Sequence, residues 1–428
     1  MSYKIYKANN GLKLLHVPNK DIKIIYVNIA VKIGSDIEKL ETLEYSHYME
    51  HLFTLLTSNK YNDGLKNRNF LSQNNIKLNA EVVTKHTLFQ FTMKNNFFDK
   101  FIDMLVNALY DYHVDEKLFQ NEKNSVVEEL NAIINDNDYK FETFIEKKIF
   151  KNHTRVYSQE ERLRNVKKTI PKNIVNFFNN YYTPNNMVLS FYGNISIKNI
   201  LKKINDFPSK PIAKLNLYNE SRFKITHKNK VNYLKETKQT CSLKIIFNIP
   251  FKFFDDEYYN IFAILNILSY DISSILVNRL RNIEGLIYDL SAFMDLDENH
   301  KYLSFIYFET NVESEKIVKV IKIIVEELTK LKTSFLDNKL IKRYKESLKI
   351  KYINDNLTFK PLKLLDEYAK YLLWNKDIVK FKDEYINFGN VDKQKIKYLS
   401  NKIFDFKNIY IFYNGSKNHN SEITKIIS

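Results

Sequence analysis

Apolar residues recur along the chain in two different patterns, and the first of them predicts strands. Residues 3–8 and 12–17 flank Asn9-Asn10-Gly11, a sequence that favours a hairpin turn. A longer β-rich run covers residues 22–33. Residues 88–93 alternate between apolar and polar side chains, as expected for a strand with one buried face. These patterns predict a sheet near the beginning of the chain.

The second pattern has the period of a helix. Residues 97–112 form an amphipathic segment, and a helix-like run extends from Asp115 to about Phe150. A shorter helix is predicted at residues 45–56. Its apolar face is formed by Tyr45, Tyr48, Met49, Leu52, Leu55 and Leu56.

The second half of the chain repeats this succession of elements. Its predicted strands are residues 241–248, 302–309 and 408–413, and its predicted helices are residues 257–270, 313–332 and 336–355. We therefore predict an α+β protein with two similar α/β-sandwich domains, each a mostly antiparallel sheet packed with helices. The predicted domains are residues 1–206 and 221–428. Residues 207–220, which contain Pro208 and Pro211, form the predicted linker.

Three polar residues share one face of the predicted helix at 45–56. His47, Glu50 and His51 form the motif H-x-x-E-H. Each residue of a helix turns by about 100°, so the three side chains lie within one narrow arc, away from the apolar face. Two neutral imidazoles one turn apart can bind zinc, and a neighbouring carboxylate can accept a proton from water. The motif is the inverse of H-E-x-x-H, as in the inverzincins. A helix with two surface histidines explains the bare motif equally well, so a third ligand is needed to decide.

The run that begins at Asp115 contains the candidates for that ligand, because a catalytic zinc site uses three protein ligands. Its buried face is defined by Phe119, Val126, Val127, Leu130, Ile133 and Ile134. Glu128 points away from this face, whereas Glu122 and Glu129 are seven residues apart along its border. A ligand for a metal held by a neighbouring helix is expected at such a border. A solvated acidic stripe describes Glu128 better than Glu129.

The combination resembles the pitrilysin/insulinase family of zinc metallopeptidases, in particular its short, processing-peptidase-like members. Glu129 follows the motif at residues 47–51 by fewer than eighty positions, and residues 121–130 are similar to the family helix E-x-x-x-V-x-x-E-[LIM]. The loop G-S-x-x-E at residues 34–38 and the segment Y-x-P-x-N-M within residues 181–187 also match. The resemblance extends over nearly the whole chain.

The resemblance implies a role for each residue of the motif. His47, His51 and Glu129 are expected to bind one zinc ion per chain, with Glu50 as the general base. Glu122 corresponds to an acid that orients a ligand and keeps the site anionic.

The resemblance also implies a substrate-binding strand. Residues 79–87 match the pattern N-A-x-x-x-x-x-H-T of an exposed edge strand beside the zinc. An edge strand can pair with an extended peptide through main-chain hydrogen bonds. Asn79 and Ala80 are therefore expected to line the substrate site. We interpret His86 as a hydrogen-bonded turn residue and not as a ligand.

A second match lies in the other half of the chain. Residues 273–288 resemble the family pattern S-S-x-L-x-x-x-[LI]-R-x-x-x-G-L-x-Y, with its arginine and tyrosine at Arg281 and Tyr288. A guanidinium and a phenol can bind substrate carbonyls and stabilise a tetrahedral oxyanion. A helix end with a surface arginine and a core tyrosine would explain the segment taken alone. Beside the zinc motif we favour the catalytic interpretation.

The chain departs from the family pattern at positions where glycine is common. Glu44 precedes Tyr45 in place of a glycine, residues 55–57 read Leu-Leu-Thr in place of a Gly-Thr, and residues 74–76 replace a glycine pair. His47, Glu50, His51 and Glu129 are all present despite these departures.

Composition narrows the range of partners and compartments. The net charge is +16, but the lysines are spread over the whole chain, and abundant Lys, Asn and Ile beside only 7 Gly indicate an AT-rich genome. We therefore predict no nucleic-acid partner. No apolar run approaches the ~20 residues of a membrane span, so no membrane partner is predicted. The start of the chain has no recognisable signal or transit peptide, and the single Cys241 excludes an intramolecular disulfide, which together predict a cytoplasmic protein.

These observations predict a zinc-dependent metalloendopeptidase that cleaves peptides or unfolded segments in an enclosed chamber. The alternative is a non-catalytic partner or scaffold subunit of the same family, although such members typically lack a ligand or the base. The resemblance implies that a chamber takes four such domains, so we expect a homodimer or a heterodimer with a paralogous chain.

Overall fold

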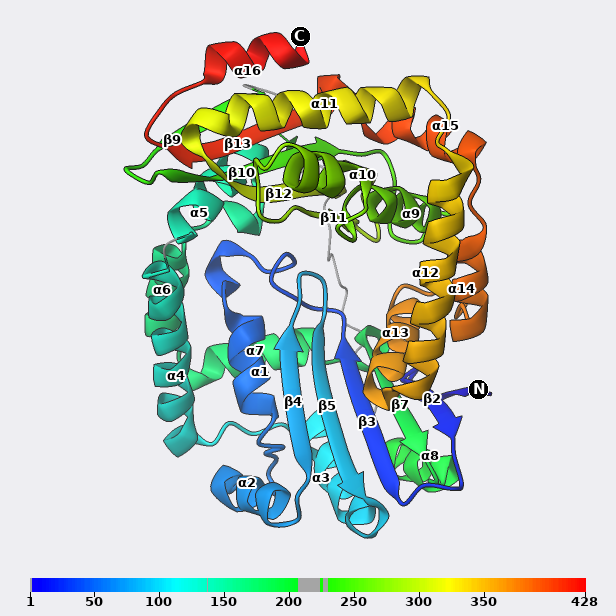
Figure 1. The fold of residues 1–428 in the computed structure, drawn as a ribbon. Coiled ribbons are helices and arrows are strands. Elements are labelled where there is room, and N and C mark those ends of the chain that lie inside the picture. Colours follow the sequence, from blue (N-terminus) through cyan, green and yellow to red (C-terminus); the bar gives the residue numbers. More distant parts are fainter. Residues whose placement is uncertain (1, 137, 207–223, 226–229) are drawn as a thin grey trace. The chain divides into compact units, whose positions relative to one another are not determined.

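The computed structural model describes residues 2–136, 138–206, 224–225 and 230–428, and Figure 1 labels its elements. The predicted linker, residues 207–220, lies outside the described residues. The chain divides into two compact units.

Six strands form the sheet of the first unit, in the order β1-β2-β7-β3-β5-β4 (Figure 1). They are β1 (Lys4–Lys7), β2 (Lys13–Pro18), β3 (Ile24–Val31), β4 (Lys77–Val82), β5 (Thr87–Lys94) and β7 (Met187–Gly193). All neighbours are antiparallel except β2 and β7, which are parallel. The first two strands form the predicted hairpin, and β4 lies at one edge of the sheet.

The helices of the first unit cover one face of this sheet. They are α1 (Tyr45–Phe53), α2 (Gly64–Gln73), α3 (Phe98–Tyr110), α4 (Glu116–Ile134), α6 (Gln159–Lys168), α7 (Pro171–Tyr181) and α8 (Ile197–Asn205). Alternate strand residues such as Val27 and Phe89 join the helices in one buried core. The ring of Phe53, at the end of α1, lies 4.8 Å from that of Phe89 and 5.9 Å from that of Phe178 on α7. This packing holds α1 against the sheet.

A helix from much later in the chain covers the opposite face. Helix α13 (Pro361–Leu373) contacts β3 and β7. Strand residues that alternate with those of the first core, such as Leu15 and Ala30, are also fully buried. The sheet therefore has two covered faces, and its central strand β3 reads as a nearly continuous apolar run for that reason.

The main sheet of the second unit has five strands, and their order repeats that of the first sheet. They are β9 (Val231–Lys235), β10 (Thr240–Asn248), β11 (Ser291–Asp295), β12 (Phe305–Glu313) and β13 (Ile409–Gly415), arranged β11-β12-β10-β13-β9. Only β9 and β13 are parallel. In sequence order and direction, β9, β10, β11, β12 and β13 correspond to β2, β3, β4, β5 and β7. This shared topology confirms the predicted α+β class with two similar, mostly antiparallel sandwiches.

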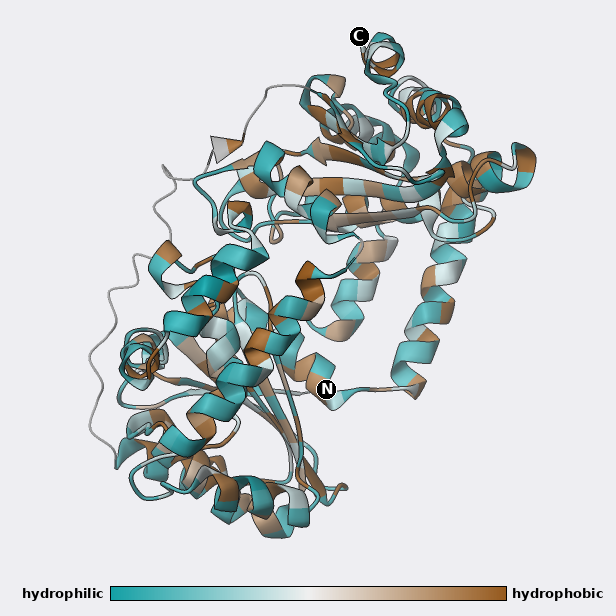
Figure 2. Cartoon of the chain, turned by 90° about the vertical axis from the view of Figure 1, so that its left-hand side faces the viewer, coloured by the Kyte–Doolittle hydropathy of each residue, from teal (hydrophilic) through white to brown (hydrophobic). Residues whose placement is uncertain are grey.

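Helices cover the second sheet in the same manner. They are α9 (Glu257–Ser269), α10 (Ile275–Val277), α11 (Ile317–Thr333), α12 (Asn338–Leu357), α14 (Phe381–Gly389), α15 (Lys393–Ile403) and α16 (Asn420–Ile427). Most pack in a second buried core with alternate residues of β10, β12 and β13. In Figure 2 these strands carry many hydrophobic residues, whereas helices of both units change between teal and brown along their turns. This is the amphipathic pattern of helices that cover a sheet.

One early helix, α5 (Tyr139–Ile149), belongs to the second unit with the short strands β6 (Phe150–Lys151) and β8 (Lys224–Ile225). The ring of Phe144 contacts that of Phe412 on β13, and Glu142 lies 2.6 Å from the ammonium of Lys244 on β10. Each unit therefore contains a helix whose neighbours in sequence belong to the other unit. The first unit comprises the described parts of residues 1–139, 152–223 and 359–379, and the second those of 140–151, 224–358 and 380–428.

The helix-like run predicted from Asp115 to Phe150 is wrong in one respect, because it is two helices. Helix α4 ends at Ile134, and α5 begins at Tyr139. The sequence between them is Asn-Asp-Asn-Asp. Such side chains compete with the helix for backbone hydrogen bonds, and the carboxylate of Asp136 accepts from the amide of Asp138. Among the helices of the described ranges, none has the length and hydrophobicity that a bilayer crossing requires.

Candidate metal centre

Helix α1 begins at an unusual backbone position. Glu44, which precedes the helix, has φ of +71°, in the left-handed region that non-glycine residues rarely adopt. The carboxylate of Glu38 accepts hydrogen bonds from the backbone amides of Glu44 at 2.8 Å and Ser46 at 2.6 Å. Amides of the first turn need such partners, because no carbonyl precedes them in the helix. The apolar side chains Tyr45, Tyr48, Met49, Leu52 and Phe53 are buried, which turns the polar face of α1 away from the core.

Left-handed backbone also occurs at the other two places where the family resemblance predicts glycine. Leu56 has φ of +48° and Asn75 has φ of +52°. The loops around α1 therefore keep a glycine-like conformation without glycine. Neighbouring contacts must stabilise these positions, since the side chains disfavour them.

Three of the predicted site residues meet at the polar face of α1. His47 and His51 lie one turn apart, with ring centroids separated by 5.2 Å. Glu129, from α4, places its carboxylate oxygens 3.0 Å from His47 Nε2 and 3.7 Å from His51 Nε2. One potential ligand atom from each of the three residues lies within 4.8 Å of the others. The two helices thus bring Glu129 to two histidines that lie 78 and 82 positions before it in the sequence.

The other glutamates of α4 take different positions. Glu122 is buried, and its Oε2 accepts a hydrogen bond of 3.2 Å from His51 Nδ1. Its second oxygen lies 2.5 Å from Arg68 on α2. Glu128 is exposed, as its position on the helical wheel predicts. Glu129 is itself about half exposed, which is expected of a border residue that can reach a neighbouring helix.

Glu50 is half-buried beside the histidines on α1. Burial raises the pKa of its carboxyl above the usual value, and the nearby imidazoles of His47 and His51 oppose that rise when they are protonated. A raised carboxyl pKa brings a general base closer to neutral pH. Glu50 is not among the residues whose donor atoms meet at the centre.

The donor set fits a zinc ion. Zinc binds imidazole nitrogen and carboxylate oxygen. The Nδ1 atoms of both His47 and His51 are paired with other carboxylates, and the Nε2 atoms of both lie near the carboxylate of Glu129. The charge of the surroundings also favours a cation. Burial lowers the pKa of His47, but the hydrogen bond and charge of Glu44 outweigh burial and, with Glu129 and Glu50, raise this pKa to about 9.

Asn79 and Ala80 lie on β4, the edge strand of the first sheet. Asn79 is exposed and Ala80 is partly buried against the core, and α1 contacts this strand. In the described part of the chain β4 pairs with β5 on one side only. Among these residues no strand pairs with its other side. His86 lies in the turn between the two strands, 3.8 Å from Asp366, and its ring contacts Trp374.

Arg281 and Tyr288 meet each other in the second unit. The guanidinium of Arg281 lies 4.7 Å from the ring centroid of Tyr288, a cation–π contact, and Tyr288 is 78% exposed. Residues Asn278–Ile283 form a π-helix, in which the amide of Glu284 bonds to the carbonyl of Arg279. Such wide turns are frequent at functional sites. Tyr288 is therefore not in the core, and the alternative of a surface arginine beside a core tyrosine is wrong for the tyrosine.

Three residues that hold the histidines, either directly or through a glutamate, were not predicted from the sequence. Glu44 bonds to His47, and Arg162 and Arg68 each bind one of the glutamates that bond to a histidine. Only Glu44 left a signal in the sequence, because it lies three residues before His47, where helical side chains meet. The arginines are far from the motif in sequence.

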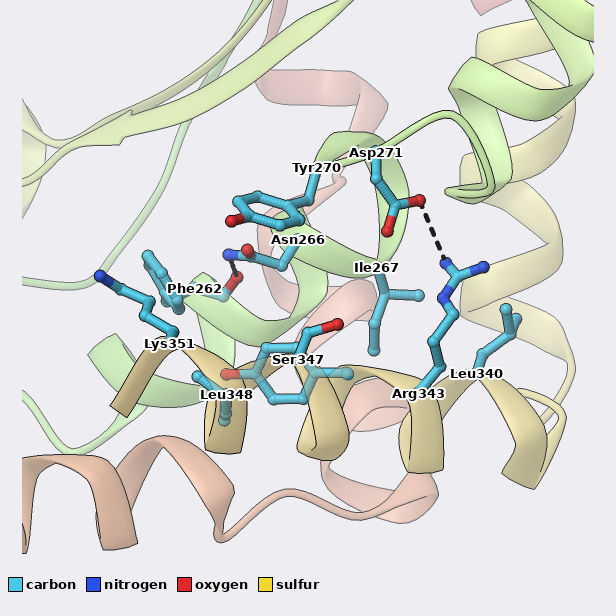
Figure 3. A pocket seen from close by; sticks show the side chains of 11 residues that line it. Phe262, Asn266, Ile267, Tyr270, Asp271, Leu340, Arg343, Ser347, Leu348 and Lys351 are labelled. Carbon is cyan, nitrogen blue, oxygen red and sulfur yellow. Dashed lines mark hydrogen bonds and ion pairs between the residues drawn. The ribbon is translucent and has the colours of Figure 1, made fainter. Parts of the chain in front are cut away.

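A small pocket lies elsewhere, in the second unit between α9 and α12 (Figure 3). Phe262, Ile267, Leu340 and Leu348 line it, with Arg343 and Asp271 at one end. Its volume of about 60 Å³ is far smaller than a peptide requires. None of the predicted site residues lines this pocket.

The fold and the centre together define the class of protein. Two topologically equivalent α+β units are present, and the first of them carries a His-His-Glu centre. Two family models match consecutive parts of the chain. Insulinase (Peptidase family M16) matches residues 15–163, and Peptidase M16 inactive domain matches residues 169–348. The chain belongs to the insulinase family, peptidase family M16. The second match begins in the first unit and contains none of His47, Glu50, His51 and Glu129.

Two individual proteins are also similar to this chain in sequence. The chain is 24% identical over 355 residues to an uncharacterized zinc protease, YmxG, of Bacillus subtilis. This match covers 81% of this chain and 82% of that protein. It is 21% identical over 249 residues to an insulin-degrading enzyme homolog of Dictyostelium discoideum. That match covers 58% of this chain but only 26% of the longer relative.

Solved structures share the fold over the whole chain. A protease from Helicobacter pylori has a TM-score of 0.79 at 17% identity, covering 96% of this chain and 99% of that one. A peptidase M16 inactive domain from Pseudomonas fluorescens also has a TM-score of 0.79, at 11% identity, covering 98% and 99%. At these identities the likeness concerns the fold alone.

Proposed function

We propose that this chain is a zinc-dependent metalloendopeptidase. The observation that carries the proposal is the meeting of His47, His51 and Glu129, with Glu50 on the same helix face as the histidines. Membership of a peptidase family with relatives named zinc proteases supports it. A non-catalytic role is the alternative, and the complete set of ligands and base argues against it.

In this proposal each residue has a separate task. His47, His51 and Glu129 would hold one zinc ion. Zinc held there would act as a Lewis acid that polarises a carbonyl oxygen and lowers the pKa of water. Glu50 accepts the proton of the attacking water and then delivers it to the leaving amine. Glu122 holds His51 through Nδ1 and so keeps Nε2 available.

The substrate class follows from the open edge of β4. An extended peptide could add to this edge as a further strand, beside Asn79 and Ala80 and next to α1. We therefore propose peptides or unfolded segments as substrates, with neither nucleic acid nor membrane as a partner. A folded protein has few free extended segments to offer.

The test compares substrates of equal sequence in two states. The zinc-loaded protein should cleave a reduced, unfolded polypeptide and fluorogenic peptides, and leave the same polypeptide intact when it is compactly folded. Mass spectrometry of the products measures both reactions. Rapid cleavage of the compact form would contradict the proposed substrate class, and no cleavage of any peptide by a zinc-loaded sample would favour the scaffold alternative.

We also propose that the active form contains a second chain, either an identical copy or a paralogue. Arg281 and Tyr288 belong to the unit without the metal motif, and one curated relative is much longer than this chain. In the proposed assembly these two residues donate hydrogen bonds to substrate oxygens at the centre of the other chain.

Complementation in trans tests this assembly. His47→Ala and Arg281→Ala should each be nearly inactive alone, since one lacks a ligand and the other an oxyanion donor. Mixed under conditions of subunit exchange, they should form heterodimers with one intact composite site and recover part of the wild-type rate. Exchange demonstrated by labelled chains but without recovered cleavage would contradict the assembly in trans.

A further inference from the structure

A buried, left-handed glutamate lies directly before the metal-binding helix. Glu44 is only 9% exposed and has φ of +71°. A buried carboxylate and a left-handed non-glycine residue are both unfavourable by themselves. Residues in such conformations persist where surrounding contacts hold them, and they concentrate at functional sites.

The two oxygens of Glu44 have different partners. Oε2 accepts a hydrogen bond of 2.9 Å from His47 Nδ1, and Oε1 accepts one of 2.6 Å from the guanidinium of Arg162. Arg162 lies on α6, is buried, and also donates to the carbonyl of Thr154 at 3.0 Å. The carboxylate is therefore charge-compensated on one side and bound to a histidine on the other.

The same arrangement surrounds His51, built from different elements. Glu122 of α4 accepts from His51 Nδ1 at 3.2 Å, and its other oxygen lies 2.5 Å from Arg68 of α2. Each histidine of the centre thus has a glutamate on Nδ1, and each glutamate has an arginine on its second oxygen. The repetition is independent of the local backbone, since Glu44 precedes α1 and Glu122 lies within α4.

This arrangement determines which nitrogen of His47 faces the other two residues of the centre. An Nδ1 that donates to a carboxylate leaves the lone pair of a neutral imidazole on Nε2. His47 Nε2 lies 3.0 Å from Glu129. The guanidinium of Arg162 fixes the direction of the Glu44 carboxylate, which in turn limits rotation of the imidazole.

We propose that Glu44 and Arg162 are positioning residues that hold His47 in the tautomer and orientation needed to bind a metal ion, as Glu122 and Arg68 do for His51. The inference rests on the proposed zinc site. It adds two residues that the motif does not contain.

Glu44 and Arg162 also link α6 to the start of α1, so their effect on stability must be distinguished from their effect on metal binding. Asn165, one turn after Arg162 on α6, donates to the carbonyl of Leu43 at 2.7 Å, so α6 is attached to the start of α1 in any case. If Glu44 and Arg162 only reinforced this attachment, their loss would change stability and leave metal affinity unchanged.

Two variants separate these roles. Glu44→Gln keeps the size of the side chain and removes its charge. The double variant Glu44→Gly with Arg162→Leu removes both charges of the ion pair together and places glycine where φ is positive. Both should weaken zinc binding about 10- to 100-fold, as is typical for partners of a metal-binding histidine. The unfolding midpoint of the metal-free double variant should stay close to the wild-type value, whereas Glu44→Gln should lower it, because buried Arg162 loses its carboxylate partner.

Asn152→Gly is the matched control, since exposed Asn152 also has positive φ, at +59°, and lies outside the centre. It should bind zinc like the wild type. Affinity is measured on the full chain by competition with a chromophoric chelator, and the visible spectrum of the cobalt-substituted protein reports the ligand geometry. Wild-type zinc affinity and cobalt spectrum in Glu44→Gln would overturn the inference, even if the double variant failed to fold. A wild-type chain that binds no zinc would instead overturn the proposed function.

Discussion

Glu50→Gln should lower the rate of peptide cleavage by about 10²- to 10⁴-fold, the usual effect of removing a general base, and leave zinc binding unchanged. Glutamine keeps the shape of the side chain but cannot accept the proton of the attacking water. Zinc should remain because the donor atoms that meet at the centre come from His47, His51 and Glu129. Measurements of kcat/KM with a fluorogenic peptide, together with the zinc content of the same sample, check both halves of the prediction.

Glu81→Gln is the control for this substitution. Glu81 lies on β4, is exposed, and is close enough to influence the charge of Glu50. Because Glu81 lies on the strand proposed to bind substrate, this change should act mainly on KM and should lower kcat far less than Glu50→Gln does. If Glu50→Gln kept the full rate in a zinc-loaded protein, Glu50 would not be the base. If Glu81→Gln lowered the rate as much as Glu50→Gln, the loss would reflect local charge and not removal of a base.

Glu129→Gln should weaken zinc binding by more than about 100-fold, beyond the loss typical of groups that only orient a ligand. An amide oxygen is a weaker donor than a carboxylate, and the centre would lose one negative charge next to both imidazoles. The carboxylate of Glu129 is the group that lies near Nε2 of both His47 and His51. Zinc affinity by chelator competition measures the effect, and cleavage should fall with it.

The neighbouring residue supplies the control. Glu128→Gln makes the same chemical change one position earlier on α4, where the side chain is exposed to solvent. Its zinc affinity should equal that of the wild type. Loss of zinc in Glu128→Gln with retention in Glu129→Gln would mean that the helix is rotated by one residue from the arrangement described above.

The sequence alone determined the features that depend on near neighbours. The apolar pattern located β10, β12 and β13 of the second sheet but not its two edge strands, β9 and β11. The spacing of three to four located α1 with His47, Glu50 and His51 on one side. The wheel of α4 separated exposed Glu128 from Glu122 and Glu129 at the border of the buried face. These inferences hold because a helix or strand fixes the direction of a side chain relative to residues only a few positions away.

The tertiary structure decided what distant segments do for one another. Helix α13 covers the first sheet, and α5 packs on the second. Their periodicity does not predict this, because an apolar helix face does not specify which sheet it covers. The partners of the histidines were hidden for the same reason, since Arg162 lies 118 positions from Glu44 and Arg68 lies 54 from Glu122. A charged pair leaves no periodic trace when its members come from separate elements. The left-handed backbone at Glu44, Leu56 and Asn75 likewise needed the structure, because glycine is its usual signal and the surrounding contacts hold it here without one.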